Sequence, residues 1–378
     1  MNDFYCAAPW RGLHIAIRGD VRVCCAGKPD MPGNLNTKTI TEILNGPELT
    51  EIRSALRQGQ THPYCEGCMD RESKGSESER TWHNKINEGF DTTQAGTEYE
   101  YPALLDIRWN STCNLSCNYC GPSDSSKWAA LKKMPINNNT RNYYLEVCEF
   151  IKNNNQHVKE VALVGGEPLL LPENEQLLDV IPADAVVTVI TNLNNPLENN
   201  RIFQKLAQRR RVGWSMSFDN VGPKFEYVRY GADWDLQLHN LDLVQDLMKN
   251  NGHWGGIHAV YNLYNATRLT EFKQFATSRG LSIKWQNLGG PPELDPRRYG
   301  QEIAVLATAE ILRVFDVCEV NDEERLLFGT ALETYQSTTQ PDPGMLEKLK
   351  KFVTQIDRYH PDQQGKFAKL WPEISNLL

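Results

Sequence analysis

The stretch Cys113-Asn-Leu-Ser-Cys117-Asn-Tyr-Cys120 places three cysteines within eight residues, shortly after the apolar run Ala103–Trp109. Three thiolates can bind one face of an iron–sulfur cluster, whereas a [4Fe–4S] cluster normally has four cysteine ligands. One iron would then keep an open position, which a catalytic metal needs. The alternatives are a zinc knuckle or buried thiols, but structural zinc sites favour four ligands in paired C-x2-C form. The triplet therefore predicts a catalytic iron–sulfur cluster.

From residue 102 to about 290 the sequence alternates predicted strands and helices. Repeated strand–helix units indicate parallel strands with right-handed crossovers. Six strands suit an open, partial TIM-type (β/α)6 barrel of the α/β class, whose active site lies at the C-terminal ends of the strands. The predicted strands are Ala103–Trp109, Val158–Val164, Val186–Thr191, Val212–Phe218, Gly256–Tyr261 and Leu281–Gln286, and the helices are Arg141–Lys152, Arg201–Gln208, Asp235–Lys249 and Arg268–Ser278.

The rest of the chain divides by composition. Residues 1–70 form a small cysteine-rich domain in which a β-hairpin turns at Gly19-Asp20, and a helix begins at Pro47. Residues 71–101 are polar and are expected to connect this domain to the barrel, with an exposed helix around Glu77 to Asn87. The barrel occupies residues 102–299. Residues 300–378 show helical periodicity only, near Ile303–Phe315, Glu323–Leu332 and Met345–Ile356.

Polar residues follow three of the predicted strands. Val164-Gly165-Gly166-Glu167-Pro168 ends the second strand, where glycines would let a ligand approach the backbone and Glu167 offers a carboxylate to an ammonium group. Thr191-Asn192 ends the third strand and Ser217-Phe218-Asp219 the fourth. Ordinary turns and caps are the alternative interpretation of each motif.

The C-x3-C-x2-C spacing after the first barrel strand resembles the radical S-adenosylmethionine (SAM) superfamily, over roughly residues 102 to 290. The resemblance implies that the open iron chelates SAM and that an electron breaks its sulfonium, releasing a 5′-deoxyadenosyl radical that abstracts a substrate hydrogen. It further implies cofactor-binding roles at the strand ends: Gly165, Gly166 and Glu167 for the SAM amino group, Thr191, Asn192, Ser217 and Asp219 for the ribose and carboxylate, and Tyr119 near adenine.

The N-terminal cysteines have their own spacing. Cys6, Gly19 and Cys24 fit C-x12-G-x4-C, and Cys65-Glu-Gly-Cys68 follows. Four thiolates suit a fully ligated [4Fe–4S] cluster or structural zinc, and Cys25 is an alternative to Cys24. The spacing resembles the SPASM or twitch motif of auxiliary clusters, which implies a second [4Fe–4S] cluster that assists electron transfer. Such modules usually follow the barrel, whereas this one precedes it. Cys148 and Cys318 lie in helical patterns and are expected to be buried.

Composition limits the partners and the compartment. Hydrophobic residues make up 40% and charged residues 23%, which suits a packed core, and the net charge of -8 argues against nucleic acid as the main partner. No apolar stretch has the length of a membrane span, and no export signal precedes the first strand. We therefore expect a cytoplasmic protein, whose ten cysteines do not form a disulfide framework.

These patterns predict a radical SAM oxidoreductase or modifying enzyme with an auxiliary cluster. Its substrate is a peptide or protein, the choice favoured by the frequency of such substrates in the family, or a small molecule, and its reductant is a flavodoxin or ferredoxin. The alternative is a non-catalytic iron–sulfur protein for electron transfer or sensing. Such a protein would need no SAM pocket and would make no 5′-deoxyadenosine.

Overall fold

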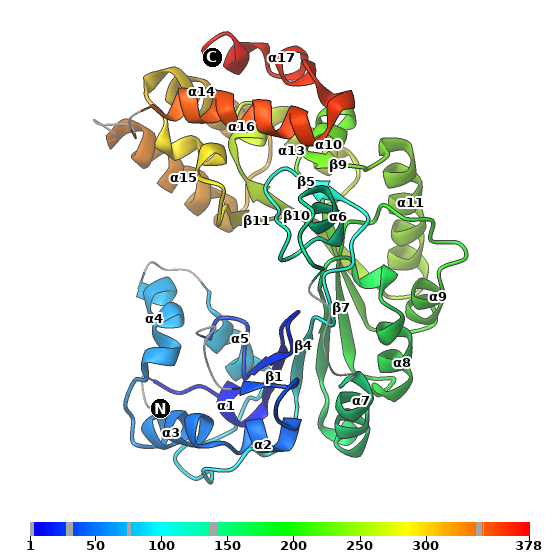
Figure 1. The fold of residues 1–378 in the computed structure, drawn as a ribbon. Coiled ribbons are helices and arrows are strands. Elements are labelled where there is room, and N and C mark those ends of the chain that lie inside the picture. Colours follow the sequence, from blue (N-terminus) through cyan, green and yellow to red (C-terminus); the bar gives the residue numbers. More distant parts are fainter. Residues whose placement is uncertain (1–3, 28–32, 74–76, 137–142, 338–341, 343) are drawn as a thin grey trace.

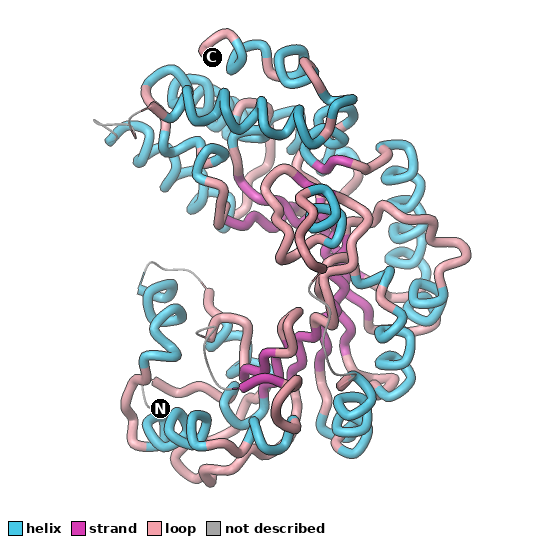
Figure 2. Tube along the Cα trace, viewed as in Figure 1, coloured by secondary structure: helices cyan, strands magenta, loops and turns pink. Residues whose placement is uncertain are grey.

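A computed structural model describes residues 4–27, 33–73, 77–136, 143–337, 342 and 344–378. The described chain forms a crescent, with N-terminal elements at one tip and C-terminal helices at the other (Figure 1). One curved nine-stranded sheet runs through it in the order β11-β10-β8-β7-β6-β4-β1-β2-β3 (Figure 2). The order is linear with β11 and β3 at its edges, so the barrel is open, as the strand count predicts.

Six parallel strands make up the barrel part of the sheet. Their side chains alternate, as in β7, where Val187, Val189 and Thr191 are buried and the residues between them are half-buried. The buried set shares the main core with the outer helices. Because successive side chains of a strand point to opposite faces, the other set lies on the concave side of the sheet. The strands, each of which overlaps its prediction, are β4 (Leu104–Ile107), β6 (Glu160–Leu163), β7 (Val186–Thr191), β8 (Val212–Ser217), β10 (Trp254–Tyr261) and β11 (Ile283–Asn287).

Helices cover the convex face, and their apolar sides join the main core. The four predicted barrel helices are present, although Arg141, where the first was expected to begin, lies outside the described residues. The main helices are α7 (Tyr144–Asn153), α8 (Pro172–Val180), α9 (Arg201–Ala207), α11 (Trp234–Asn250) and α13 (Leu269–Ser278). The shorter elements are β5 (Ser116–Cys117), α6 (Ser126–Leu131), η2 (Asn155–His157), η3 (Pro168–Leu170), α10 (Gly222–Val228), β9 (Arg229–Tyr230) and α12 (Leu263–Ala266).

The N-terminal hairpin extends the barrel sheet. The predicted turn forms at Gly19, whose φ of +81° suits glycine, and β1 pairs antiparallel with β2. β1 also pairs in parallel with β4, so the sheet continues across the predicted domain boundary. The N-terminal elements are α1 (Ala8–Arg11), β1 (Gly12–Ile15), β2 (Asp20–Arg22), β3 (Gly33–Asn34), α2 (Ile40–Leu44), α3 (Pro47–Arg57), η1 (Pro63–Cys65) and α4 (Glu66–Ser73).

The helix of the polar connector, α5 (Glu79–Ile86), is only partly exposed, so the expectation of an exposed helix is wrong for one of its faces. His83 is 1% exposed and lies against Gly12 of β1. Asn84 accepts a hydrogen bond from the Ala7 amide and donates one to the Tyr5 carbonyl. Polar side chains on this face thus hold the N-terminal segment without adding apolar surface that the sequence would reveal.

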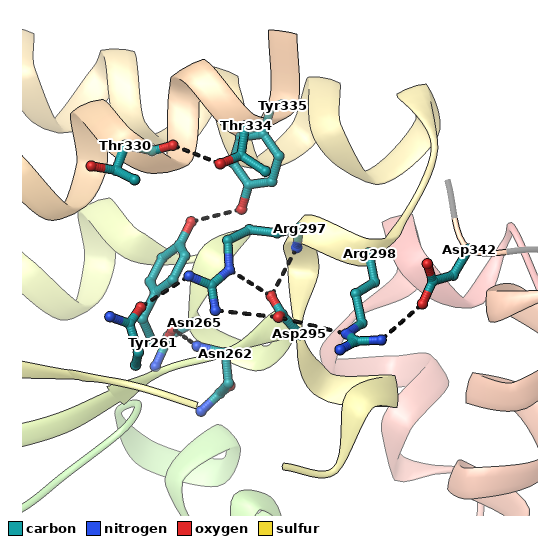
Figure 3. A network of polar contacts seen from close by, with 11 residues as sticks. Tyr261, Asn262, Asn265, Asp295, Arg297, Arg298, Thr330, Thr334, Tyr335 and Asp342 are labelled. Atoms are coloured by element: carbon teal, nitrogen blue, oxygen red, sulfur yellow. Dashed lines mark hydrogen bonds and ion pairs between the residues drawn. The ribbon is translucent and has the colours of Figure 1, made fainter. Parts of the chain in front are cut away.

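The described C-terminal residues form helices only, as predicted, and polar contacts fix them to the barrel. Lys273 of α13 forms a buried ion pair with Glu324 of α15 at 2.6 Å. Figure 3 shows a second set of polar contacts. The hydroxyl groups of Tyr261 and Tyr335 form a hydrogen bond of 3.0 Å, and the Arg297 guanidinium pairs with the Asp295 carboxylate. The elements are η4 (Pro292–Leu294), η5 (Pro296–Arg298), α14 (Gln301–Val317), α15 (Asp322–Ser337), α16 (Met345–Tyr359), η6 (Pro361–Gln363), α17 (Lys366–Leu370) and α18 (Pro372–Ser375).

Within the described part of the chain, no helix combines the length and the apolar character that crossing a membrane requires.

Candidate functional site

The cysteine triplet lies in a loop that leaves the C-terminal end of β4. Cys113 donates its amide hydrogen to Ser126 Oγ at 3.0 Å, and Cys117 in β5 pairs antiparallel with Arg229 in β9. Trp128 of α6 donates its indole hydrogen to the Cys117 carbonyl at 2.8 Å. The loop is therefore held by two elements, α6 and β9.

The environment of the three thiols disfavours a bare negative charge. Burial raises the pKa of Cys113, Cys117 and Cys120 to about 12 each, and each thiol also feels the charge of another member of the triplet. Thiolates in such a place need a cation to balance them. Iron supplies that charge, so the donor set fits an iron–sulfur cluster held by three cysteines.

Gly165 and Gly166 pack the end of β6 against the residues before Cys113. A Cβ at Gly166 would lie 2.3 Å from the Thr112 carbonyl oxygen, and Gly165 has a φ of +137°. The next amide, that of Glu167, donates to the Thr112 carbonyl at 2.8 Å. The close neighbour of the two glycines is thus the protein backbone that leads into the triplet.

The Glu167 carboxylate is fully buried and joins the second strand to the third. It accepts hydrogen bonds from the Thr191 hydroxyl and the Asn192 amide, both at 2.7 Å, and from the Leu169 amide at 3.1 Å. Burial raises the pKa of Glu167 to about 7, despite these hydrogen bonds. Asn192 connects Glu167 with the triplet, because its side-chain amide nitrogen lies 3.8 Å from Cys113 Sγ.

Asp219 follows the end of β8, and an arginine and a tyrosine both donate hydrogen bonds to one of its carboxylate oxygens. Oδ2 accepts hydrogen bonds from Arg229 at 2.8 Å and from Tyr119 at 2.6 Å, and Oδ1 accepts one from the Val260 amide. The carboxylate is fully buried, so Asp219 holds protein groups in place. Ser217, two residues earlier, is half-buried on the concave face of β8.

Arg229 is a site residue that the sequence interpretation missed. Its guanidinium is 3.9 Å from Cys117 Sγ and is almost fully buried. Burial opposes its charge, but Asp219 more than compensates and raises the pKa of Arg229. In the sequence, Arg229 is only an arginine ten residues after Asp219. Arginine is common at the end of a helix, so its position alone does not indicate a role in the site.

The four predicted N-terminal ligands line one cavity. Cys6, Cys24, Cys65 and Cys68 come from the first segment, the end of the hairpin, η1 and α4, and burial raises the pKa of Cys24 and Cys65 to about 12. Cys25 is not part of the lining and instead feels the charges of Glu79, Asp106 and Arg108. This donor set fits a second iron–sulfur cluster, and the cavity favours Cys24 over Cys25.

Arg80 of α5 is a second residue that the sequence interpretation missed, and it places a positive charge in this cavity. Its guanidinium pairs with Glu72, and the charges of Cys6 and Cys68 contribute to raising its pKa. Of the two remaining cysteines, Cys148 is buried in α7, as expected. Cys318, which follows α14, is only half-buried.

Comparison with known proteins identifies both cysteine regions. Residues 107–268 match the model of the radical SAM superfamily, and residues 6–69 match that of the SPASM iron–sulfur cluster-binding domain. A curated relative, 7-carboxy-7-deazaguanine synthase of Clostridium acetobutylicum, is 38% identical over 89 residues, which are 23% of this chain and 36% of the synthase.

Two solved structures show weaker similarity. The structure of anSMEcpe with bound AdoMet is 18% identical with a TM-score of 0.39, over 58% of this chain and 63% of that one. Streptococcus suis SuiB bound to the precursor peptide SuiA is 14% identical with a TM-score of 0.40, over 72% and 64%. The chain thus spans less than two thirds of each of these three relatives.

Each family model covers one of the two cysteine sites. The radical SAM model includes the triplet, and the SPASM model includes all four proposed N-terminal ligands. They imply a [4Fe–4S] cluster, SAM and auxiliary iron–sulfur binding, and membership implies an enzyme. Residues 107–268 thus form a radical SAM domain, and residues 6–69, on its N-terminal side, form a SPASM-type iron–sulfur cluster-binding domain.

Proposed function

We propose that this chain is a radical SAM oxidoreductase or modifying enzyme that reductively cleaves SAM at a [4Fe–4S] cluster held by Cys113, Cys117 and Cys120. The observation that carries the proposal is the meeting of the ends of β6, β7 and β8 at the triplet, through Gly166, Asn192 and the Asp219–Arg229 pair. When bound, the cluster and SAM supply a 5′-deoxyadenosyl radical that removes a hydrogen atom from the substrate.

The buried charges at the triplet suit an amino acid moiety. Arg229 holds a guanidinium beside Cys117, where it would attract the SAM carboxylate. Asp219 keeps Arg229 charged and fixes its direction. Glu167 carries a carboxylate of which Oε2 accepts only one of the observed hydrogen bonds, so it could accept another from the SAM ammonium group. Thr191 and Asn192 would orient Glu167.

The concave face of the sheet supports a polar substrate. Strand alternation assigns four polar residues of four strands to this side, namely His14, Asp106, Glu160 and His258. His14 lies 3.2 Å from Asp106. A peptide or protein, with its charged and hydrogen-bonding groups, fits this lining better than an apolar molecule. We therefore propose a peptide or protein substrate, with a polar small molecule as the second choice.

The auxiliary site would take up an electron that substrate oxidation releases. Zinc could occupy four thiolates but has no accessible redox state, whereas a second [4Fe–4S] cluster could accept the electron. Full ligation by Cys6, Cys24, Cys65 and Cys68 would leave no open iron, which favours electron transfer over substrate binding. Arg80 would offset part of the negative charge of this site.

The direct test replaces Cys113, Cys117 and Cys120 by Ala. Because the catalytic cluster loses all three ligands, anaerobically reconstituted protein with SAM and dithionite should form no 5′-deoxyadenosine, while about four irons per chain remain in the N-terminal site. Cys318→Ala is the matched control and should keep wild-type product formation. Formation of 5′-deoxyadenosine by the triple variant would refute the assignment.

The second prediction concerns Glu167→Gln, measured as SAM affinity of reconstituted protein under anaerobic conditions. Loss of a charge-assisted hydrogen bond of about 1.5–3 kcal/mol should weaken SAM by roughly one to two decades. Because the raised pKa of Glu167 is about 7, the carboxylate is protonated below that pH and charged above it. Wild-type affinity should therefore rise about tenfold from pH 6 to pH 8. An unchanged affinity in the variant would remove Glu167 from the SAM site.

Replacing Cys24 or Cys25 by Ala tests which of the two cysteines is a ligand of the auxiliary cluster. Cys24→Ala removes a thiol that lines the N-terminal cavity, so the iron content should fall from about eight to about four per chain. Cys25→Ala is the matched control and should retain about eight irons, because its thiol lies outside the cavity lining. The reverse pattern, or zinc bound to the wild-type protein in place of four irons, would contradict the assignment.

A further inference from the structure

A basic groove lies along helix α16, on a protein whose net charge is -8. Its lining includes Lys350, Lys351 and Arg358 but only one carboxylate, that of Glu347. The Lys351 side chain is 75% exposed and pairs with Glu347 at 3.4 Å, and Arg358 is also exposed. A concentration of positive charge on an acidic protein attracts a partner of opposite charge.

The groove ends at the loop that carries the catalytic cysteines. Tyr359, the last residue of α16, is part of the groove lining, and its ring meets the buried Trp128 ring edge-on at 5.5 Å between centroids. Trp128 in turn donates its indole hydrogen to the Cys117 carbonyl at 2.8 Å. Two aromatic rings and one hydrogen bond thus connect the groove with a residue of the cysteine triplet.

A second exposed patch joins the groove at Tyr359. Lys132, at the end of α6, places its ammonium 5.8 Å from the centre of the Tyr359 ring and 5.1 Å from that of Trp128. The residues after it include Met134 and Ile136, whose side chains are 50% and 43% exposed. Figure 1 shows α16 running toward the region of α6 and β5. Basic side chains around exposed apolar ones are suited to transient protein docking.

We infer that the α16 groove and the end of α6 form the docking surface for a small acidic electron-carrier protein of the flavodoxin or ferredoxin type, and that Tyr359 and Trp128 provide its route to the cluster. The inference rests on the proposed function, which requires an external electron. The reduced carrier loses one electron and the catalytic cluster gains it, and no bond is made or broken in this step. Charge complementarity would mainly increase the rate of encounter.

The test uses reconstituted protein and purified bacterial flavodoxin. Lys351→Glu/Arg358→Glu should weaken the binding of oxidised flavodoxin, measured by calorimetry, by about tenfold or more at low salt. It should also remove most of the salt dependence that wild-type binding shows. The rate at which reduced flavodoxin bleaches the cluster absorbance should fall to a similar extent, whereas the rate with dithionite should stay within about twofold of wild type.

Two further variants complete the test. Arg210→Glu/Lys249→Glu makes the same change of charge at exposed positions that are not part of the groove, and it should leave flavodoxin binding unchanged. Tyr359→Leu should keep the binding affinity but slow cluster reduction by flavodoxin.

Wild-type binding in the Lys351→Glu/Arg358→Glu variant, or an equal loss in the Arg210→Glu/Lys249→Glu control, would overturn the docking surface. An equal loss of the reduction rate with dithionite would show that the substitutions damage the cluster site itself, and it would also overturn the docking surface. An unchanged rate in Tyr359→Leu would overturn the route. The proposed function itself fails separately, if wild-type protein with dithionite forms no 5′-deoxyadenosine.

Discussion

Strand β4 is the element on which both iron–sulfur sites depend. It pairs in parallel with β1 of the N-terminal hairpin on one side and with β6 on the other. Its C-terminal end carries the cysteine triplet, and β1 connects through the hairpin to the cavity of the auxiliary site. A shift in the pairing of β1 with β4 would therefore move one cysteine site relative to the other. The single sheet gives both sites one rigid support, although the sequence divides them into two domains.

Charge balance is the second constraint on the molecule. The seven proposed ligand thiols are buried or half-buried. Two arginines accompany them, Arg229 at the triplet and Arg80 at the N-terminal cavity. Thiolates there are favourable only with nearby positive charge, which the arginines supply in part and iron would complete. The raised pKa of Glu167 follows the same principle, because an ammonium ligand would stabilise its charged form. The site is thus arranged for cofactors that bring their own charges.

Local patterns predict those parts of the structure that local interactions decide. Alternating apolar residues locate the six barrel strands, and the prediction of Val186–Thr191 agrees residue for residue with β7. Cysteine spacing locates the triplet for the same reason, since its three members lie within eight residues. The N-terminal set runs from Cys6 to Cys68, and its resemblance to a known motif, not closeness in the sequence, predicts that its members belong together. Long-range contacts are different. The pairing of β1 with β4, the buried face of α5 around His83 and the approach of Arg229 to Cys117 all join segments that no spacing connects. The sequence also gives no reason to suspect that Asp219 binds a protein guanidinium.

SAM should bind the iron that the triplet leaves open. The most direct measurement is electron–nuclear double resonance of the reduced protein with SAM labelled with ¹⁵N at its amino group, in a Cys24→Ala background that leaves only the catalytic cluster. A ¹⁵N hyperfine coupling should appear, and it should disappear when Cys113, Cys117 and Cys120 are replaced by Ala. A reduced cluster that shows no such coupling at saturating SAM would contradict this assignment.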